Sequence, residues 1–247
     1  MRRLFSATIP CNAGCQYCFS KWNGIYCEQA QFAIERICDR EAIIYPCCDG
    51  EFFEQNNIIE VTKSIMEKMD KVYLSISTKC PITTTQLRTI IELNDMLQSE
   101  GKGFVKFSVS VSNKSKLSEI EPRTTRYEDR IDIVRRLVSE GIPSSLTLKP
   151  ILPFIADEEY FEILEDFSAI VNRVLVGGLY VCSNTRFYKE YIKDRYPLEK
   201  REVNWLSEKP VWDYVNDQAK INRIKQRATE LGMTPYDSDA DLVASLI

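Results

Sequence analysis

Residues 4–19 read LFSATIPCNAGCQYCF, a short apolar run followed directly by a loop with three cysteines. The cysteines are Cys11, Cys15 and Cys18, and the aromatic Tyr17 stands just before the last of them. Iron–sulfur clusters are held by cysteine thiolates, and a four-iron cluster with a complete protein set uses four. Three thiolates on one tight loop would leave one iron open. An open position at a metal is typical of a catalytic site, because a substrate or cofactor can occupy it.

A structural zinc site would need a fourth sulfur or imidazole ligand close to these cysteines. The chain contains no histidine, and the next cysteine, Cys27, has no CxxC partner. The spacing therefore favours a [4Fe-4S] cluster, with zinc as the alternative. The absence of histidine also removes Ser-His-Asp hydrolysis, histidine-ligated zinc hydrolysis and imidazole general-base chemistry.

The composition of the 247 residues is that of an ordinary globular protein, with 44% hydrophobic and 28% charged residues. A net charge of −4 argues against nucleic acid as a partner. Residues 186–196 interleave aromatic and basic side chains with acids at helical spacing, which favours a surface helix over a base-stacking surface. No apolar run reaches the length of a membrane span, and no secretory signal is recognisable. Nine cysteines fit a reducing compartment, so we expect a cytoplasmic protein.

Short apolar runs alternate along the chain with segments of helical spacing. The predicted strands are Leu4–Ile9, Ala42–Pro46, Val72–Ser77, Val105–Val111, Ser145–Leu152 and Val174–Val181. The predicted helices contain Ile58–Met69, Leu87–Leu97, Ile131–Val138 and Glu158–Ala169. Six such βα units predict an α/β fold whose parallel sheet is open or curled into a partial barrel. In such sheets the active site lies at the carboxyl ends of the strands.

The alternation fails from about residue 198 onward. Trp205 and Trp212 lie in a proline-interrupted stretch, and a helical pattern follows over Val215–Leu231. We interpret residues 1–197 as the α/β domain and residues 198–247 as a cap that packs on it, with a small separate interaction module as the alternative.

Polar motifs follow several of the predicted strands. They are Cys47-Cys48-Asp49-Gly50-Glu51, Ser75-Ile76-Ser77-Thr78-Lys79-Cys80, Phe107-Ser108-Val109-Ser110, Glu121-Pro122-Arg123 and Lys149-Pro150-Ile151-Leu152-Pro153. The cysteine loop matches the CxxxCx(aromatic)C signature of the radical S-adenosylmethionine (SAM) superfamily. With the other motifs, over residues 11–153, the chain resembles the spore photoproduct lyase-like branch of that superfamily. The resemblance implies a partial (β/α)6 barrel of parallel strands, closed here by a C-terminal helical cap.

The resemblance also implies a reaction. A [4Fe-4S] cluster held by Cys11, Cys15 and Cys18 would bind S-adenosyl-L-methionine at its open iron. An electron from a donor such as flavodoxin or ferredoxin would then cleave SAM to methionine and a 5′-deoxyadenosyl radical. That radical would take a hydrogen atom from an unidentified organic substrate, a small molecule or a peptide. Two alternatives stay open: a DNA photolesion lyase, and a non-catalytic iron–sulfur or zinc protein acting as a scaffold or sensor.

Three charged residues match the polar ends of SAM in this comparison. The SAM ammonium group needs acceptors beside the cluster, and Asp49 and Glu51 supply carboxylates there; the superfamily usually has Gly-Gly-Glu at this point. The SAM carboxylate needs a cation, for which Lys79 has the right position and charge. In the competing interpretation, Lys79 is a solvated loop residue and the two acids cap the helix that begins near Asn57.

Smaller polar and aromatic residues complete the predicted cofactor site. Ser108 and Ser110 are candidates for the ribose hydroxyls, although a serine in a strand can simply be a small residue facing a helix. Tyr17 is a candidate for shielding the cluster or the adenine. For Glu121 and Arg123, a structural role in bracing a loop is the favoured interpretation.

Cys47 and Cys48 are adjacent at the end of the second predicted strand. In lyases of the resembled branch, a cysteine near this point can donate a hydrogen atom to a product radical, and thiol hydrogens are weakly bound. We therefore predict a catalytic role for Cys47 or Cys48. The alternative is that both pack as small hydrophobic residues, as free cysteines often do.

Overall fold

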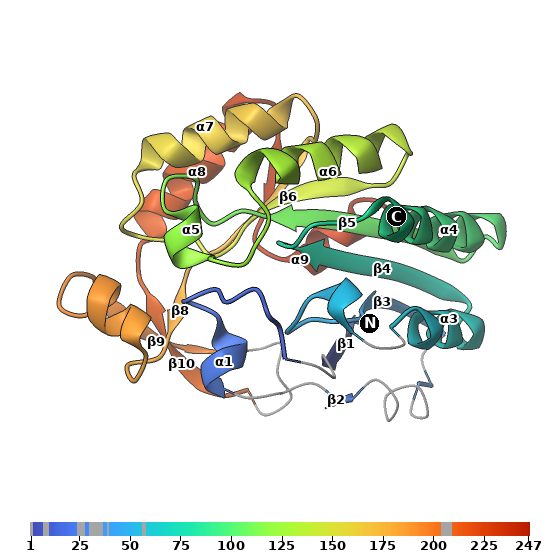
Figure 1. Cartoon of the computed structure of the whole chain (residues 1–247), viewed down its shortest axis with the longest axis horizontal. Coiled ribbons are helices and arrows are strands. Elements are labelled where there is room, and N and C mark those ends of the chain that lie inside the picture. Colours follow the sequence, from blue (N-terminus) through green and yellow to red (C-terminus); the bar gives the residue numbers. More distant parts are fainter. Residues whose placement is uncertain are drawn as a thin grey trace.

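The structure is a computed structural model that describes residues 2–6, 10–23, 28–29, 37–38, 40–55, 58–203 and 209–247. Its main feature is a curved parallel sheet with helices packed against its outer face (Figure 1). The strands are β1 (Arg2–Ser6), β2 (Glu28–Gln29), β3 (Glu41–Tyr45), β4 (Lys71–Thr78), β5 (Gly103–Ser110), β6 (Ser144–Leu148), β7 (Arg173–Val176) and β11 (Thr234–Tyr236). They lie in the order β11-β7-β6-β5-β4-β3-β1-β2, and every neighbouring pair is parallel. The predicted α/β class is confirmed.

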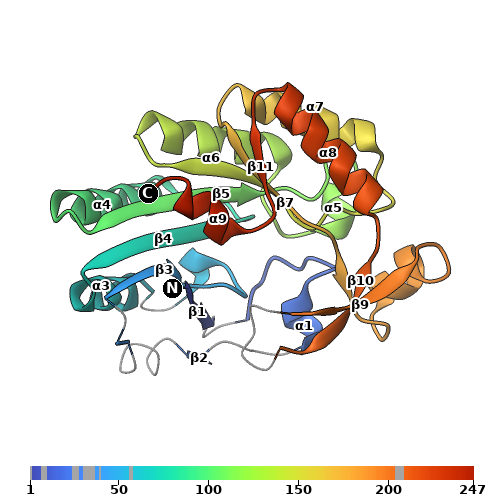
Figure 2. The same cartoon turned by 180° about the vertical axis from the view of Figure 1, so that it is seen from behind.

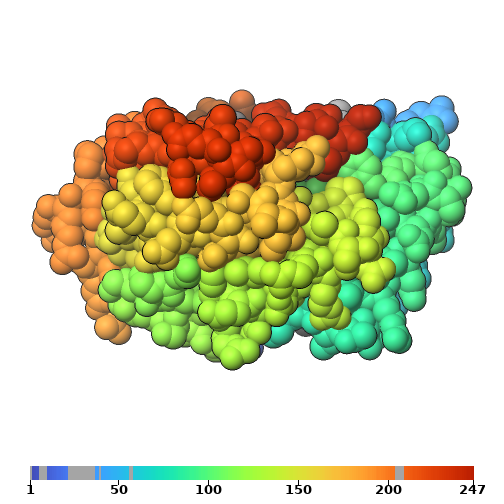
Figure 3. Space-filling view, turned by 90° about the horizontal axis from the view of Figure 1, so that it is seen from above, coloured from blue at the N-terminus to red at the C-terminus, as the bar shows by residue number. Residues whose placement is uncertain are grey.

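Most helices connect the strands and cover the outer face of the sheet, whereas α9 (Asp239–Ala244) lies on the concave side (Figure 2). The helices are α1 (Phe19–Asn23), α3 (Ile58–Lys68), α4 (Thr84–Ser99), α5 (Leu117–Ile120), α6 (Tyr127–Ser139), α7 (Asp157–Ser168), α8 (Gln218–Glu230) and α9 (Asp239–Ala244), with a 3₁₀ turn η1 (Phe52–Glu54) and a π-helical turn η2 (Tyr188–Ile192). Figure 3 shows α8, in red, lying along α7, in yellow. Within the described ranges, every helix is too short or too polar to span a bilayer.

The helix α4 shows how local sequence sets these elements. Thr83 and Gln86 form a capping box at its start, each side chain bonding the other's backbone amide. Its buried residues recur at helical spacing as the sequence predicts: Leu87, Ile90, Leu93, Asn94 and Leu97. The chain then turns through Gly101, whose φ of +63° suits glycine.

The two faces of the sheet differ in polarity. On β5, Val105 and Phe107 alternate with Lys106 and Ser108, and all four are buried. Lys106 contacts α9, which lies on the opposite side of the sheet from α4 and α6 (Figure 2). Because side chains alternate along a strand, Val105 and Phe107 face the helices, while Lys106 and Ser108 face the concave side. The apolar face builds the core, and the concave face is left polar.

Two predicted strands differ from the observed ones at their ends. For the first predicted strand, β1 covers the described part, and residues 7–9 lie outside the described part of the chain. The fifth ends at Leu148, because Pro150 has no N–H with which to continue a ladder. The sixth divides at Gly177-Gly178 into β7 and a separate strand β8 (Tyr180–Val181). A Cβ atom on Gly178 would lie 1.9 Å from Tyr214 Oη, so this crossing requires a glycine.

The C-terminal segment contains strands as well as the expected helices. β9 (Leu198–Glu202) and β10 (Val211–Val215) join β8 in a three-stranded antiparallel sheet, and β11 pairs with β7 in the main sheet. Trp212 packs on Phe19 of α1 with ring centroids 5.9 Å apart, whereas Trp205 lies outside the described residues. The division at residue 198 stays a prediction.

Candidate active site

The cysteine loop lies between β1 and α1, at the carboxyl end of the parallel strands. Cys11, Cys15 and Cys18 are all free thiols. The Ala13 amide donates to Cys11 Sγ at 3.4 Å, and Cys18 Sγ lies 2.9 Å from the Ser20 hydroxyl. The loop therefore presents three unlinked sulfurs with polar groups beside two of them.

A second segment of the chain braces this loop. The Gln16 amide donates to the Ile120 carbonyl at 2.9 Å, and the Arg123 amide donates to the Ala13 carbonyl at 3.1 Å. Gly14 has a φ of +78°, and a Cβ atom there would approach Arg123 Nε to 3.2 Å. Glycine thus provides both the turn and the close approach. Arg123 has the bracing role that the sequence favours.

Glu121 forms the centre of a buried charge network under the loop. Its side chain is fully buried, and Oε1 accepts hydrogen bonds from Lys79 Nζ and Ser112 Oγ, both at 2.8 Å. Tyr17 Oη also donates to this oxygen. Burial alone would raise the pKa of the Glu121 carboxyl, but the charges of Lys79 and Arg130 outweigh it and lower the pKa to about 2.

Arg130 closes the network from α6. Its Nη2 donates to Glu121 Oε2 at 2.7 Å and its Nη1 to the Ser110 carbonyl at 2.7 Å, and the guanidinium is 1% exposed. Nε donates to the Thr125 carbonyl at 3.1 Å. Because the guanidinium donates to both carboxylate and carbonyl acceptors, these hydrogen bonds offset the free-energy cost of burying its charge.

Two of the predicted cofactor residues, Tyr17 and Lys79, belong to the same network. Lys79 Nζ lies 4.7 Å from the centre of the Tyr17 ring and donates to the Tyr17 hydroxyl as well as to Glu121. Burial lowers the pKa of Lys79, but the Glu121 charge reverses the effect and the pKa is raised. Lys79 is therefore a held cation rather than a solvated loop lysine. These two contacts use two of the three N–H donors of its ammonium group.

Glu51 joins the ends of β3 and β4. Its carboxylate accepts from Thr78 Oγ1 at 2.5 Å and from the Lys79 backbone amide at 3.1 Å. Burial raises the pKa of Glu51, and these hydrogen bonds partly offset the rise. Asp49 is half-buried on the preceding turn. The structure thus brings Tyr17, Glu51 and Lys79 together at one point of the strand ends.

Hydroxyl groups continue the polar concave face beyond these residues. Ser108 Oγ donates to the Ile76 carbonyl at 3.3 Å and Ser110 Oγ to the Lys149 carbonyl at 3.4 Å. In the register of the sheet, Ser145 lies opposite Ser108 and Thr147 lies opposite Ser110. Within the described residues, the buried hydroxyls of Ser145 and Thr147 have no hydrogen-bond partner. Because buried polar groups are usually hydrogen-bonded, these two unpaired hydroxyls are exceptional positions on this face.

Three further thiols lie at this end of the sheet. Cys47 and Cys48 are half-buried, and the Cys48 amide donates to the Phe5 carbonyl at 3.0 Å, which ties their turn to β1. Burial, reinforced by the Asp49 and Glu51 charges, raises the pKa of Cys47, so its sulfur keeps its proton. Burial also raises the pKa of Cys80, and the charges of Glu51, Glu54, Cys11 and Cys15 contribute.

The donor set fits an iron–sulfur cluster. Within the described ranges, no group of three or more histidine, cysteine, aspartate or glutamate side chains is spaced to hold a single metal ion. A cuboidal cluster instead needs thiolates on separate irons, and three free thiols on one braced loop meet that need.

Some residues of this region carry no signal in the sequence. Ser145 and Thr147 read as ordinary strand residues, and only the register with Ser108 and Ser110 places them on the same face. Arg130 lies in a helix, where its position among other charged residues gives no hint of burial. Long-range pairing alone identifies these three residues.

Comparison with known proteins supports the same assignment. The family model described as "Spore photoproduct lyase" matches residues 53–234. The match begins after the cysteine loop, so the loop is separate evidence. The Uncharacterized protein MJ0683 of Methanocaldococcus jannaschii is 24% identical over 234 residues, covering 89% of this chain and 84% of its own length.

Solved structures share the fold. A spore photoproduct lyase mutant with bound AdoMet and dinucleoside spore photoproduct aligns with a TM-score of 0.65 at 15% identity, covering 95% of this chain and 76% of that one. Streptococcus suis SuiB bound to S-adenosylmethionine aligns with a TM-score of 0.61 at 11% identity, covering 95% of this chain and 49% of that one. The predicted partial barrel is confirmed. The chain belongs to the spore photoproduct lyase family of radical SAM enzymes.

Proposed function

We propose that this enzyme binds one [4Fe-4S] cluster through Cys11, Cys15 and Cys18 and uses it to cleave S-adenosyl-L-methionine reductively. The observation that carries the proposal is the braced loop of three free thiols, set against a polar concave face. Held by these three thiolates, the cluster would supply the electron for reductive cleavage of the SAM sulfonium and so the means of hydrogen abstraction from an organic substrate.

The protein side chains would bind and orient SAM. Lys79 is charged and held beside the cysteine loop, so its remaining N–H suits the SAM carboxylate. Glu51 and Asp49 supply acceptors for the ammonium group. The hydroxyl groups of the concave face, including Ser108 and Ser110, suit the ribose.

Cys47 is the stronger candidate of the adjacent pair for hydrogen-atom donation. Donation requires a protonated sulfur, and burial keeps the Cys47 thiol protonated. Cys48 stays the second candidate, because its backbone is fixed against β1. Cys11, Cys15, Cys18, Cys47, Cys80 and Cys182 are free thiols, as expected in a reducing compartment such as the cytoplasm. A flavodoxin or ferredoxin would serve as electron donor there.

Formation of 5′-deoxyadenosine tests the proposal. The protein is reconstituted anaerobically with iron and sulfide, and SAM and dithionite are added. We expect 5′-deoxyadenosine to form and to be detected by chromatography. Cys15→Ala should abolish both the nucleoside and the bound iron, because one thiolate is lost from the loop. Cys182→Ala, which removes a half-buried thiol outside the loop, should preserve both.

Two outcomes would point elsewhere. Bound iron without any nucleoside, even with candidate substrates added, would favour a scaffold or sensor. Iron retained in Cys15→Ala would mean that the loop is not the cluster site.

A DNA photolesion lyase is the second candidate. It is favoured by solved neighbours of the same fold, spore photoproduct lyases with bound dinucleoside spore photoproduct. Such an enzyme must hold the phosphate backbone, so its duplex binding should weaken steeply as salt increases. Lack of duplex binding at low salt would exclude this candidate, in keeping with the acidic net charge of −4.

A further inference from the structure

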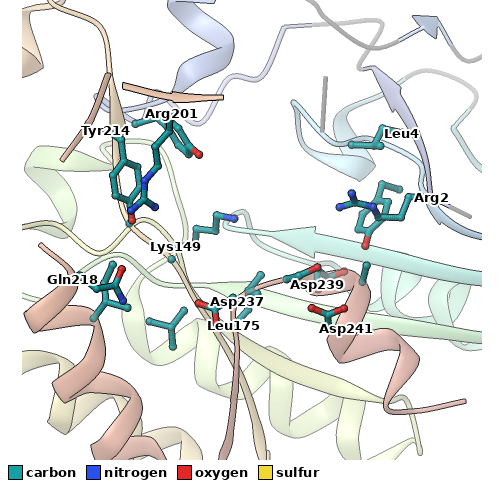
Figure 4. Close-up of a pocket in the computed structure, with 18 residues that line it drawn as sticks. Arg2, Leu4, Lys149, Leu175, Arg201, Tyr214, Gln218, Asp237, Asp239 and Asp241 are labelled. Atoms are coloured by element: carbon teal, nitrogen blue, oxygen red, sulfur yellow. The ribbon is translucent and has the colours of Figure 1, made fainter. Parts of the chain in front are cut away.

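A second cavity of about 630 Å³ opens on the concave side of the sheet, apart from the cysteine loop. Its walls come from both ends of the chain: Arg2 and Leu4 on β1 form one side, and the C-terminal segment Asp237–Asp241 forms another (Figure 4). Its volume is in the range that small-molecule sites occupy, roughly 300–1,000 Å³. The cysteine loop and the predicted SAM contacts are not among its lining residues.

Lys149 continues the concave face from the hydroxyl groups into this cavity. It follows Ser145 and Thr147 at alternate positions of the chain, and its side chain lies between the Arg201–Tyr214 pair and the aspartates (Figure 4). A Cβ atom on Gly177 would lie 2.8 Å from Lys149 Cδ. The bare backbone of Gly177 thus makes room for the stem of Lys149.

Arg201 is held in a fixed orientation on the same wall. Its guanidinium carbon lies 3.7 Å from the centre of the Tyr214 ring. Glu199 accepts from Nε, the inner nitrogen of the guanidinium, so this contact does not use the terminal nitrogens. Tyr214 in turn packs against Gly178, where no side chain would fit. A stacked arginine of this kind presents a planar set of donors to carboxylate or phosphate oxygens.

Two of the carboxylates in the cavity are neutralised from behind. Asp239 lies 2.5 Å from Lys106 Nζ and accepts from Ser75 Oγ at 2.6 Å. Asp237 pairs with Lys225 of α8. Neither Lys106 nor Lys225 lines the cavity, so their charges offset the aspartates without occupying its space. Arg201 is paired in the same way with Glu199, and the charges of Asp239 and Asp237 still act on Lys149. Lys149 and Arg201 are therefore two cations on the same side of a cavity that also holds carboxylates (Figure 4).

We propose that this cavity binds the enzyme's substrate through an anionic group, a carboxylate or a phosphate, which Lys149 and Arg201 hold together. The inference rests on the proposed function and adds the substrate class to it. Burial lowers the pKa of Lys149, although the charges of Asp239 and Asp237 oppose the effect. The ammonium form of Lys149 holds the anion, and the neutral amine in equilibrium with it condenses with an aldehyde.

Pyridoxal 5′-phosphate is a suitable probe, because it joins an aldehyde to a phosphate. Its aldehyde condenses with a lysine amine to an imine with loss of water, and borohydride reduces the imine to a stable secondary amine. The full reconstituted chain is labelled without dithionite, quenched with borohydride and mapped by mass spectrometry. We expect Lys149 to be labelled about tenfold faster than exposed Lys63, the effect of roughly one charge-assisted contact.

Pyridoxal, which lacks the phosphate, should lose most of this preference. Arg201→Gln should also lose it, whereas Lys200→Gln, on the outward side of the same strand, should keep it. Thermal melting of both variants checks that each is folded. Protection of Lys149 by inorganic phosphate would identify a phosphate ligand, and protection by citrate a carboxylate.

Four results would overturn the proposal. The first two are equal labelling of Lys149 and Lys63 and a preference that survives Arg201→Gln. The third is protection by SAM, which would place the cavity within the cofactor site, and the fourth is the absence of protection by either phosphate or citrate. Because labelling needs no SAM cleavage, it can succeed where the 5′-deoxyadenosine assay fails, and the reverse also holds.

Discussion

Glu121 contacts residues that the sequence predicts to bind SAM and residues for which the sequence predicts no role. One carboxylate contacts Lys79, Tyr17, Ser112 and Arg130, which come from four separate places in the chain. The ammonium group of Lys79 and the guanidinium group of Arg130 both pair with the Glu121 carboxylate. Lys79 therefore stays charged beside the cysteine loop at any pH at which Glu121 is ionised. Glu121 therefore acts on the predicted cofactor site by positioning Lys79 and Tyr17.

Glu121→Gln tests this role. Removing the charge leaves Lys79 and Arg130 buried without their carboxylate, and breaking a buried ion pair typically costs about 3–5 kcal/mol. We expect a loss of that size in the free energy of unfolding at pH 7, measured by urea denaturation. Glu119→Gln, two residues away on the surface, should change stability little.

The lowered pKa of Glu121 predicts that the free energy of unfolding depends on pH. The pKa of Glu121 is lowered from 4.5 to about 2, so its stabilising effect is complete above pH 4.5 and is lost as the pH falls toward 2. The wild-type protein should therefore lose more stability than Glu121→Gln over this interval. Parallel acid curves for the two proteins would show that the pKa of Glu121 is the same in the folded and unfolded states, which would contradict the ion pairing.

Local spacing explains which site residues can be predicted from the sequence. Cys11, Cys15 and Cys18 are separated by only a few residues, so their joint role is visible without a fold. Glu121 and Tyr17 are 104 residues apart in the sequence, and nothing in either neighbourhood indicates the pairing. Ser145 and Thr147 are identified only by the register of β5 and β6.

At the scale of elements, the short helix α9 fastens the C-terminal segment to the concave face. Asp239 lies at its first position and pairs with Lys106, whose side chain is 0% exposed. Ser75 of β4 donates to the second carboxylate oxygen of Asp239. The charge of Lys106 is attractive in the pair and lowers the pKa of Asp239 in spite of burial. The segment thus closes the floor of the second cavity.

Asp239→Asn should loosen this attachment. The substitution leaves Lys106 buried without a counter-charge, so we expect a loss of about 3–5 kcal/mol in unfolding free energy. Asp241→Asn, at an exposed position of the same helix, is the matched control. The double variant Lys106→Met, Asp239→Asn should recover much of the loss, because no buried charge is left unpaired. Additive losses in the double variant would contradict the pairing.

Element boundaries were harder to predict than element types. The alternation of apolar runs and helical spacing predicts β3 to β6 and the helices between them, because burial on one face sets that pattern. The division between β7 and β8 depends on a long-range contact. The ring of Tyr214 packs against the backbone of Gly178, which lies 36 residues earlier in the chain. β9 to β11 are short and partly exposed, so their patterns are weak.

In the whole molecule, the two faces of the sheet have different roles. The helix-covered face holds the apolar core, and the concave face carries the polar groups of the predicted sites. The helix side of the sheet holds the apolar core, so stability does not require the inner side to be filled with hydrophobic residues. The inner side instead carries the cysteine loop at one end, hydroxyl groups across β5 and β6, and the mixed-charge cavity beyond them. This order would place the proposed cofactor and substrate sites in one continuous concave surface.

Electron paramagnetic resonance of the dithionite-reduced, reconstituted protein is the most direct test of the central claim, a four-iron cluster on three thiolates with an accessible iron. The account predicts a signal of a reduced [4Fe-4S] cluster whose g-values shift when SAM is added, because SAM binds the open iron. The shift should be absent when SAM is left out. A cluster signal that SAM leaves unchanged would contradict the account.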